Sequence, residues 1–248
     1  MNLPLQIRFE TAAHIPPPFS HQYSLGLSKN AEGKIEADFK LAYTSRETLE
    51  LIEIFDEGFS ENDDFEWQGE INANWTSRIE QKIQELKIEL NQKSEENLFE
   101  IKQNDDSDWI VPENQETLEY FFRELYQGFY EKDEREMPFS LTLINVDSAS
   151  KKQVIELNAS FYSREYKVII NSKSERLLDW DSFEKDVKLI YAGEYLTEQA
   201  TKKNPIREGL YISIGDGYWY EMGKSLQKPS GNKNYYKQLA ELYDSFLM

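Results

Sequence analysis

Two groups of residues in this chain have types and spacing that could support chemistry. His14 and His21 flank Pro16-Pro17-Pro18, so the two imidazoles could share a metal ion or gate the loop through their protonation. A metal site needs a third ligand that the sequence does not supply, and we interpret both as surface-loop histidines. The acidic loops at 56–66 and 105–108 resemble calcium ligands in composition. Neither fits the EF-hand pattern of glycine at position 6 and glutamate at position 12, so we interpret both as solvated loops.

The most ligand-like element is the aromatic, glycine-rich run at 215–220. Glycine lets a backbone approach a partner closely, and Tyr and Trp are favoured at binding hot spots. The alternating residues 210–214 precede this run, which predicts a β-hairpin with a glycine-rich turn. In a strand, Tyr218 and Tyr220 would face one way and Trp219 the other. At least one of the two faces is therefore expected to be core.

Motifs of the common enzyme classes are absent from the sequence. It lacks the GxxxxGK[ST] loop of nucleotide hydrolases, the GxGxxG dinucleotide fingerprint and the GxSxG turn of serine hydrolases. The absence of cysteine excludes disulfides, thiolate metal sites and a cysteine nucleophile. Carboxylates are so numerous that some must lie close together by chance, so they do not indicate a glycosidase pair. We therefore expect no catalytic residue, no metal and no cofactor.

The charge of the chain is strongly acidic and unevenly distributed, with a formal net charge of −18. Residues 45–136 contain 27 acids and 9 bases, whereas 1–44 (4 and 4) and 137–248 (15 and 15) are balanced. Such an excess argues against nucleic acid or anionic membrane as a direct partner, because phosphate binding needs clustered Lys and Arg. It favours a basic protein partner. The alternative is a solvated, self-repelling surface that serves solubility alone.

The elements that must position these groups follow from hydrophobic periodicity. Alternation of apolar and polar residues predicts a strand at 3–9 and a hairpin over 23–43. Residues 46–55 fit either a short helix or a strand, and 67–71 fit a short strand. A helix is predicted over 75–90, because one stripe contains Trp75, Ile79, Ile83, Leu86 and Leu90.

The second half of the chain shows the same mixture of patterns. Residues 91–108 are polar and acidic apart from a few apolar positions, and we interpret them as a linker. A helix is predicted over 113–130, with an apolar face of Leu118, Phe121, Phe122, Leu125 and Phe129. The last third predicts strands at 139–143, 155–161 and 166–170, and helices over 180–191 and 233–247.

These patterns together predict an α+β fold in which antiparallel β-hairpins and meanders pack against amphipathic helices. We divide the chain provisionally at the polar stretch near 102–110, which gives α+β subdomains over 1–105 and 106–248. A single intertwined domain fits the patterns nearly as well. Helices that start at Trp75 and Trp180 suggest that the two subdomains are similar.

Charge and composition predict a non-enzymatic, cytoplasmic protein-interaction module. The chain has no apolar run of the ~18 residues that a membrane span needs, and its N-terminus lacks the features of a signal peptide. A specific form of this prediction is an acidic antagonist or immunity-type protein that masks a basic, nucleic-acid-handling partner by electrostatic mimicry. The candidate docking residues in the acidic segment are Asp63, Asp64 and Glu66.

The alternative is a small-molecule-binding protein or a hydrolase that uses the aromatic hairpin at 215–220. Its candidate binding residues are Tyr218, Trp219 and Tyr220. A deep apolar pocket with convergent polar groups would support this alternative, whereas carboxylates aligned on one face would support the docking module.

Overall fold

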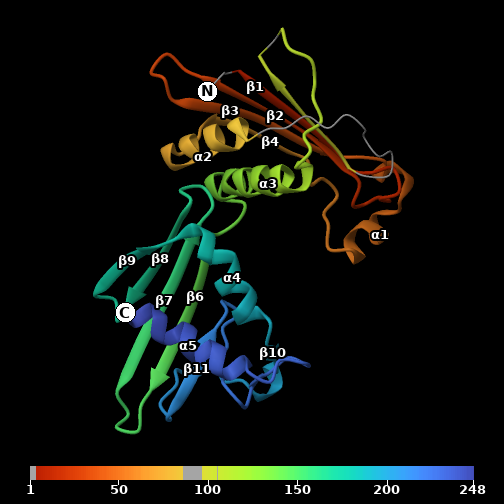
Figure 1. The fold of residues 1–248 in the computed structure, drawn as a ribbon. Helices are drawn as coiled ribbons and strands as arrows, with labels where there is room; N and C mark the ends of the chain where they lie inside the picture. The colour runs from red at the N-terminus through yellow and green to blue at the C-terminus, as the bar shows by residue number, and fades with distance from the viewer. Residues whose placement is uncertain (1–3, 86–96, 105) are drawn as a thin grey trace. The chain divides into compact units, whose positions relative to one another are not determined.

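The computed structural model describes residues 4–85, 97–104 and 106–248, and it has the α+β fold expected from the sequence. The chain forms two compact units, Met1–Arg135 and Glu136–Met248, and each unit has its own hydrophobic cluster. Antiparallel sheets pack against helices in both units (Figure 1). Within the described residues, no helix is long and apolar enough to span a membrane.

The first unit contains a five-stranded antiparallel sheet. Its strands lie in the order β4-β3-β2-β1-β5. Every second side chain points toward the helices and is buried, as the period of two in a β-strand requires. The strand bounds are β1 (Leu5–Glu10), β2 (His21–Lys29), β3 (Ile35–Tyr43), β4 (Phe65–Glu70) and β5 (Leu98–Gln103).

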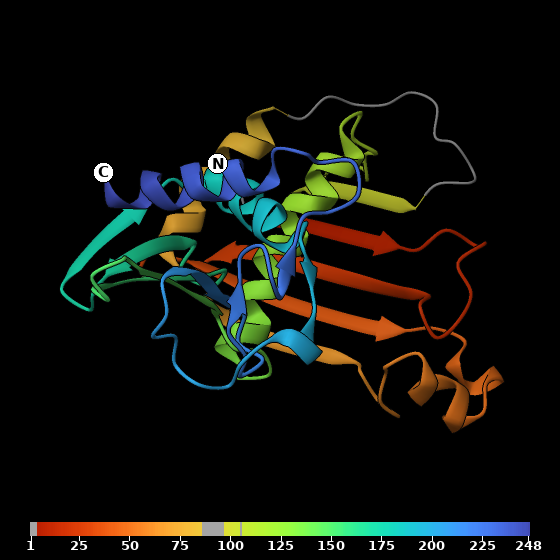
Figure 2. The same ribbon diagram turned by 90° about the horizontal axis from the view of Figure 1, so that it is seen from below.

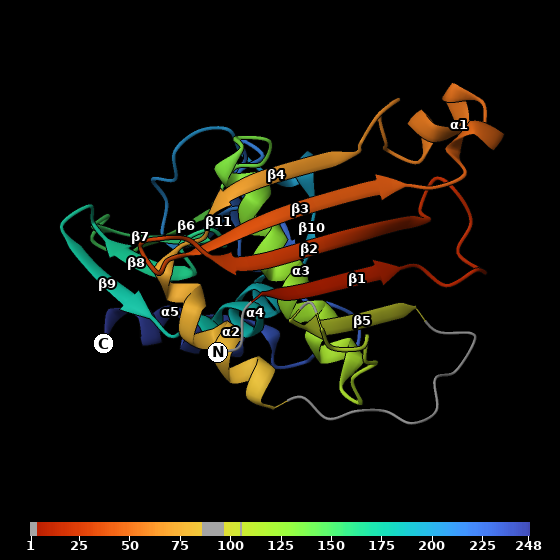
Figure 3. The same ribbon diagram turned by 90° about the horizontal axis from the view of Figure 1, so that it is seen from above.

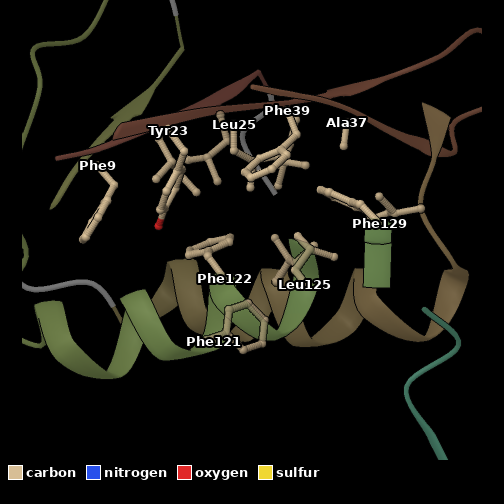
Figure 4. Packing of buried hydrophobic residues seen from close by; sticks show 14 of the residues in the cluster. Phe9, Tyr23, Leu25, Ala37, Phe39, Phe121, Phe122, Leu125 and Phe129 are labelled. Atoms are coloured by element: carbon tan, nitrogen blue, oxygen red, sulfur yellow. The ribbon is translucent and has the colours of Figure 1, made fainter. Parts of the chain in front are cut away.

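Two helices, α2 (Ala73–Gln84) and α3 (Gln115–Lys132), cover one face of this sheet (Figures 1 and 3). Figure 4 shows Phe122, Leu125 and Phe129 of α3 pointing at the sheet, which faces them with Tyr23, Leu25 and Phe39. A third helix, α1 (Leu51–Asp56), follows a short 3-10 turn (Arg46–Thr48). It lies beyond the ends of β3 and β4.

The predicted amphipathic helices are largely confirmed. All five residues of the predicted apolar face of α3 are buried. In α2, Trp75 and Ile79 are buried and Ile83 is partly buried, while Leu86 and Leu90 lie outside the described residues. The cap of α2 is Asn72, whose side-chain oxygen accepts the backbone N–H of Asn74 at 2.9 Å.

The interpretation of residues 91–108 as a linker is wrong for the part that forms β5. Phe99 and Ile101 are fully buried, and β5 pairs with β1. The apolar face of α3 belongs to the same hydrophobic cluster as this sheet. The two units therefore divide between Arg135 and Glu136, and the provisional division at 102–110 falls inside the first unit.

The second unit contains a six-stranded sheet of order β12-β11-β6-β7-β8-β9. Two helices, α4 (Trp180–Tyr191) and α5 (Tyr235–Leu247), pack on one face, and α5 leads to the C-terminus (Figure 2). A small additional sheet joins β10 (Glu194–Tyr195) to β13 (Leu226–Gln227). The main strands are β6 (Phe139–Val146), β7 (Lys152–Ser160), β8 (Glu165–Ile170), β9 (Ser174–Leu178), β11 (Gly209–Ser213) and β12 (Tyr220–Glu221).

The two units share the order of their main strands and helices, apart from α1 in the first unit and β10, β12 and β13 in the second. In the first, β1 to β4 form a meander, α2 follows, β5 then pairs with β1, and α3 comes last. In the second, β6 to β9 form a meander, α4 follows, β11 then pairs with β6, and α5 comes last. The two units therefore resemble each other in the topology of their main elements.

The helices that follow the two meanders, α2 and α4, begin in the same way. Asn72 caps α2, and the carboxylate of Asp179 caps α4 by accepting the backbone N–H of Asp181 at 3.2 Å. A buried tryptophan follows each cap, Trp75 in α2 and Trp180 in α4. The same local solution for starting a helix thus occurs at equivalent places in both units.

Candidate functional site

The charge excess coincides with the first unit. Residues 1–135 contain 30 acids and 13 bases, whereas residues 136–248 contain 16 and 15. A basic partner would therefore be attracted to the first unit far more strongly than to the second.

The most acidic part of this unit is the connection between β3 and β4, residues 44–64, which Arg46 anchors. The Arg46 guanidinium lies 3.8 Å from the Tyr43 ring centroid and 4.6 Å from that of Phe59. It donates to the carboxylate of Asp63 at 2.6 Å and to the carbonyl oxygen of Pro18 at 3.3 Å. The connection is thus fixed to the unit by stacking, an ion pair and backbone contacts together.

Helix α1 projects from this anchored connection. It begins with a capping box, in which Glu50 and Glu53 each accept a backbone N–H from the other end of the first turn. Ile54 is its buried residue, whereas Leu51, Ile52 and Phe55 are 48%, 63% and 49% exposed. A helix of six residues can rest on the unit along one side, so its other apolar side chains face solvent.

Exposed carboxylates surround these three apolar side chains in the sequence. We call the set the α1 surface, and it consists of Leu51, Ile52 and Phe55 with the exposed acids Glu47, Asp56, Glu57 and Glu61. Scattered single apolar residues are normal on a protein surface, but a cluster with a polar rim is typical of interaction sites.

The predicted docking carboxylates have different roles in the structure. Asp63 pairs with Arg46 and accepts hydrogen bonds from the backbone N–H and the hydroxyl of Ser60. Burial alone would raise the pKa of Asp63, but these bonds from Ser60 and Arg46 lower it. Asp64 accepts the backbone N–H of Tyr43 at 2.8 Å. Glu66 lies on β4 with 74% of its side chain exposed, 3.9 Å from Lys40.

Asp63 and Asp64 therefore hold the connection in place, and Glu66 has the weakest contact of the three, an exposed ion pair with Lys40. Sequence reasoning missed Leu51, Ile52 and Phe55, since apolar residues in a periodic segment are normally assigned to the core. The available signal was the shortness of the apolar run at 49–55 and the acids on both sides of it.

The predicted aromatic hairpin is confirmed, because β12 pairs antiparallel with β11 after the turn at Gly215 and Gly217. Tyr220 is buried in the core of the second unit, and its hydroxyl donates to Asp216. Burial and this hydrogen bond raise the pKa of Tyr220. Tyr220 is therefore not available to a ligand.

The neighbouring residues divide between the two faces, as the alternation requires. Tyr218 packs against the core cluster, and the Lys202 ammonium lies 4.9 Å from its ring centroid. Trp219 packs against the opposite apolar cluster of Ile144, Val146 and Tyr211. It lines a pocket of about 530 Å³ whose loop, residues 199–207, sequence reasoning did not single out.

The two histidines lie in and at the end of the connection between β1 and β2. His14 lies in an exposed loop, and His21 opens β2 with its Nδ1 atom 2.9 Å from the carbonyl oxygen of Phe19. The His21 ring also lies 5.3 Å from that of Phe9. Within the part of the chain that the structure describes, no three His, Asp or Glu side chains are grouped to hold a metal ion.

Comparison with known proteins gives this chain no family. No protein-family model matches it, and neither the curated proteins nor the solved structures contain a match. The α1 surface and the pocket beside Trp219 are therefore the candidate functional sites of the described residues.

Proposed function

We propose that this chain is a protein-interaction module that binds a basic partner protein through the α1 surface. The observation that carries the proposal is the exposure of Leu51, Ile52 and Phe55 within an acidic segment. Burial of such side chains in an interface is favourable by about 25 cal/mol per Å² of apolar area. The acids would add attraction and select the charge of the partner.

The partner that fits this surface has apolar side chains bordered by Lys and Arg, as on one face of a basic amphipathic helix. The Arg46 anchor supports the proposal, because a surface held before binding loses less conformational entropy when the complex forms. A flexible acidic tail would lack this advantage.

A narrower form of the proposal is an antagonist or immunity-type protein of the cytoplasm. A first unit with 30 acids against 13 bases offers a polyanionic surface to a protein that handles nucleic acid. This form predicts that DNA or RNA competes with the chain for the same partner, because both would occupy one basic surface. A partner whose binding is indifferent to added nucleic acid would contradict the narrower form and leave the general one standing.

The experiment begins with capture of partners from lysate at low and high salt, followed by binding kinetics on the partner retained most strongly. Two variants separate the two parts of the surface. Leu51, Ile52 and Phe55 changed together to Ser should mainly speed dissociation, because apolar contact is lost. Asp56→Asn with Glu57→Gln and Glu61→Gln should mainly slow association, because steering is lost.

A matched control changes the same amount of charge in the second unit, at the exposed residues Glu194, Glu198 and Glu208, each to Gln. This control should bind almost as the parent does. The proposal fails if the retained partners are not basic. It also fails if the binding rate constants change neither with salt concentration nor in either α1 variant. The charge of the first unit would then serve solubility alone.

A further inference from the structure

The pocket in the second unit is built by a loop fastened at both ends to aromatic residues. Thr201 and Trp219 exchange two backbone hydrogen bonds, at 3.1 and 2.8 Å. At the other end of the loop, the Tyr211 hydroxyl donates to the carbonyl oxygen of Arg207 at 3.2 Å. Residues 201–207 are therefore held against the pair of rings that line the cavity.

The Tyr211 side chain, which forms one wall of the pocket, is held in place by packing. Tyr211 is 4% exposed and packs in one cluster with Ile144 and Val146. Gly209 has φ of +150°, and a Cβ atom there would lie 3.2 Å from Cε2 of Tyr211. Glycine at this position therefore lets the ring lie close to the backbone without displacement.

The charged residues of the pocket lining are two cations and one acid. Lys203 and Arg207 are both exposed at the loop and contribute two positive charges. Glu221 is the acid of the lining, and its carboxylate is already paired with Lys224. A chain with a net charge of −18 thus places two cations beside a tryptophan and a tyrosine.

We propose that this pocket binds a small planar aromatic molecule that bears one anionic group, either a phosphate or a carboxylate. The ring would pack against the partly exposed Trp219, with the buried Tyr211 forming part of the pocket wall, and the anionic group would pair with Lys203 and Arg207. A cavity of about 530 Å³ lies within the usual range for small-molecule sites, roughly 300–1,000 Å³.

This site is independent of the α1 surface, because its lining residues all belong to the second unit. Of the predicted aromatic hairpin, Trp219 lines this site, whereas Tyr220 is buried in the core and takes no part in it. Failure of the docking proposal would leave the pocket proposal standing, and the reverse holds as well.

The test uses two matched pairs of probes on the full chain. AMP and adenosine share a planar base and differ in the phosphate, whereas indole-3-acetate and indole-3-acetamide share a ring and a methylene and differ in the carboxylate, which the second replaces with a neutral amide. The readout is the indole N–H signal of Trp219 in two-dimensional NMR, identified among the five tryptophans by its loss in Trp219→Phe. The two pairs also distinguish a phosphate ligand from a carboxylate ligand.

We expect at least one anionic probe to shift the Trp219 signal with a Kd of about 1 mM or tighter, and its neutral counterpart to bind about tenfold more weakly. Lys203→Gln with Arg207→Gln should bring the anionic probe to the affinity of the neutral one. The control variant, Lys228→Gln with Lys233→Gln, removes two exposed cations that do not line the pocket and should change nothing.

Three results would overturn the proposal. One is the absence of any Trp219 shift with either anionic probe at about 10 mM, tenfold above the weakest expected Kd. Another is equal binding of charged and neutral probes, and the third is an effect of the control variant as large as that of the pocket variant. Lys203 and Arg207 are exposed, so circular dichroism should show that their variants stay folded.

Discussion

Arg46 donates to the carboxylate of Asp63 across 2.6 Å, and this pair joins the two ends of the connection that carries α1. The Arg46 side chain is 10% exposed, so it is largely removed from water. Loss of its anionic partner should therefore cost more than loss of a surface ion pair.

Asp63→Ala should loosen residues 44–64 while the rest of the first unit stays folded. Leaving a largely buried charged donor without its partner costs roughly 1–3 kcal/mol. Here we expect it to lower the free energy needed to open residues 44–64 locally, and to leave global unfolding almost unchanged. Hydrogen exchange should show faster amide exchange in residues 44–64. Glu66→Gln is the control, because that side chain is 74% exposed and should leave exchange unchanged. Equal effects of both variants would contradict the assigned role of Asp63.

The same segment should lose protection as pH falls. The pKa of Asp63 is lowered in the folded state, so the unfolded segment binds more protons in acid. The stabilisation is complete above the ordinary carboxyl pKa of about 3.9 and disappears as pH falls through the lowered value. Hydrogen exchange across this range should show the loss in the parent and little pH dependence in Asp63→Asn. An identical profile in both proteins would count against the prediction.

Ile79→Ala should destabilise the first unit by roughly 2–5 kcal/mol, because it leaves a cavity beneath α2. Ile79 is 0% exposed. Ile83→Ala should cost less, since Ile83 is partly buried at the edge of the same cluster. Chemical denaturation of both variants measures the loss in the free energy of unfolding. Equal losses at Ile79 and Ile83 would contradict the prediction that burial decreases along α2.

Residues 1–135 and 136–248 should each fold when produced separately. Each unit has its own sheet, its own helices and its own hydrophobic cluster. Circular dichroism and cooperative thermal unfolding of the two fragments check this expectation. In the full chain, Ile79→Ala should then lower the melting temperature of one transition and leave the other in place. A single transition that shifts as a whole would show that the two cores unfold together.

Asp186→Asn should stabilise the second unit at neutral pH and have little effect in acid. Asp186 is 8% exposed and accepts a hydrogen bond from the Tyr166 hydroxyl at 3.2 Å. Burial raises the pKa of Asp186, so the folded state binds its proton more tightly than the unfolded state.

The stability contribution of Asp186 is therefore greatest in acid and falls as pH rises through the raised pKa. An Asn amide oxygen still accepts from Tyr166 without a buried charge. Melting temperatures at about pH 3 and about pH 7, on either side of ordinary carboxyl values, give the test. Glu184→Gln on the exposed side of α4 is the control, and a destabilised Asp186→Asn at neutral pH would refute the prediction.

The elements predicted well were those whose pattern is local. The hairpin over 23–43 and the helix over 113–130 each show an uninterrupted period, and both are present. β5 was missed because it has just two buried residues, Phe99 and Ile101, among polar neighbours. It pairs with β1, whose residues lie 88 to 98 positions earlier in the sequence.

The candidate sites divide in the same way. Alternation alone predicted that Trp219 and Tyr220 face opposite sides, and they do. The pocket depends on the backbone pairing of Thr201 with Trp219, a contact between distant residues that no local pattern reveals. The roles of Asp63 and Asp64 likewise depend on Arg46 and Tyr43, which lie about twenty residues earlier.

Repetition of one strand order with two separate cores affects how this chain can change during evolution. Like charges on one unit repel each other and oppose its compact state, so each added acid lowers the stability of the unit that carries it. In this chain nearly all of that cost falls on residues 1–135, because residues 136–248 are close to neutral. Successive mutations can therefore remodel the acidic surface up to the stability limit of the first unit without altering the pocket of the second unit.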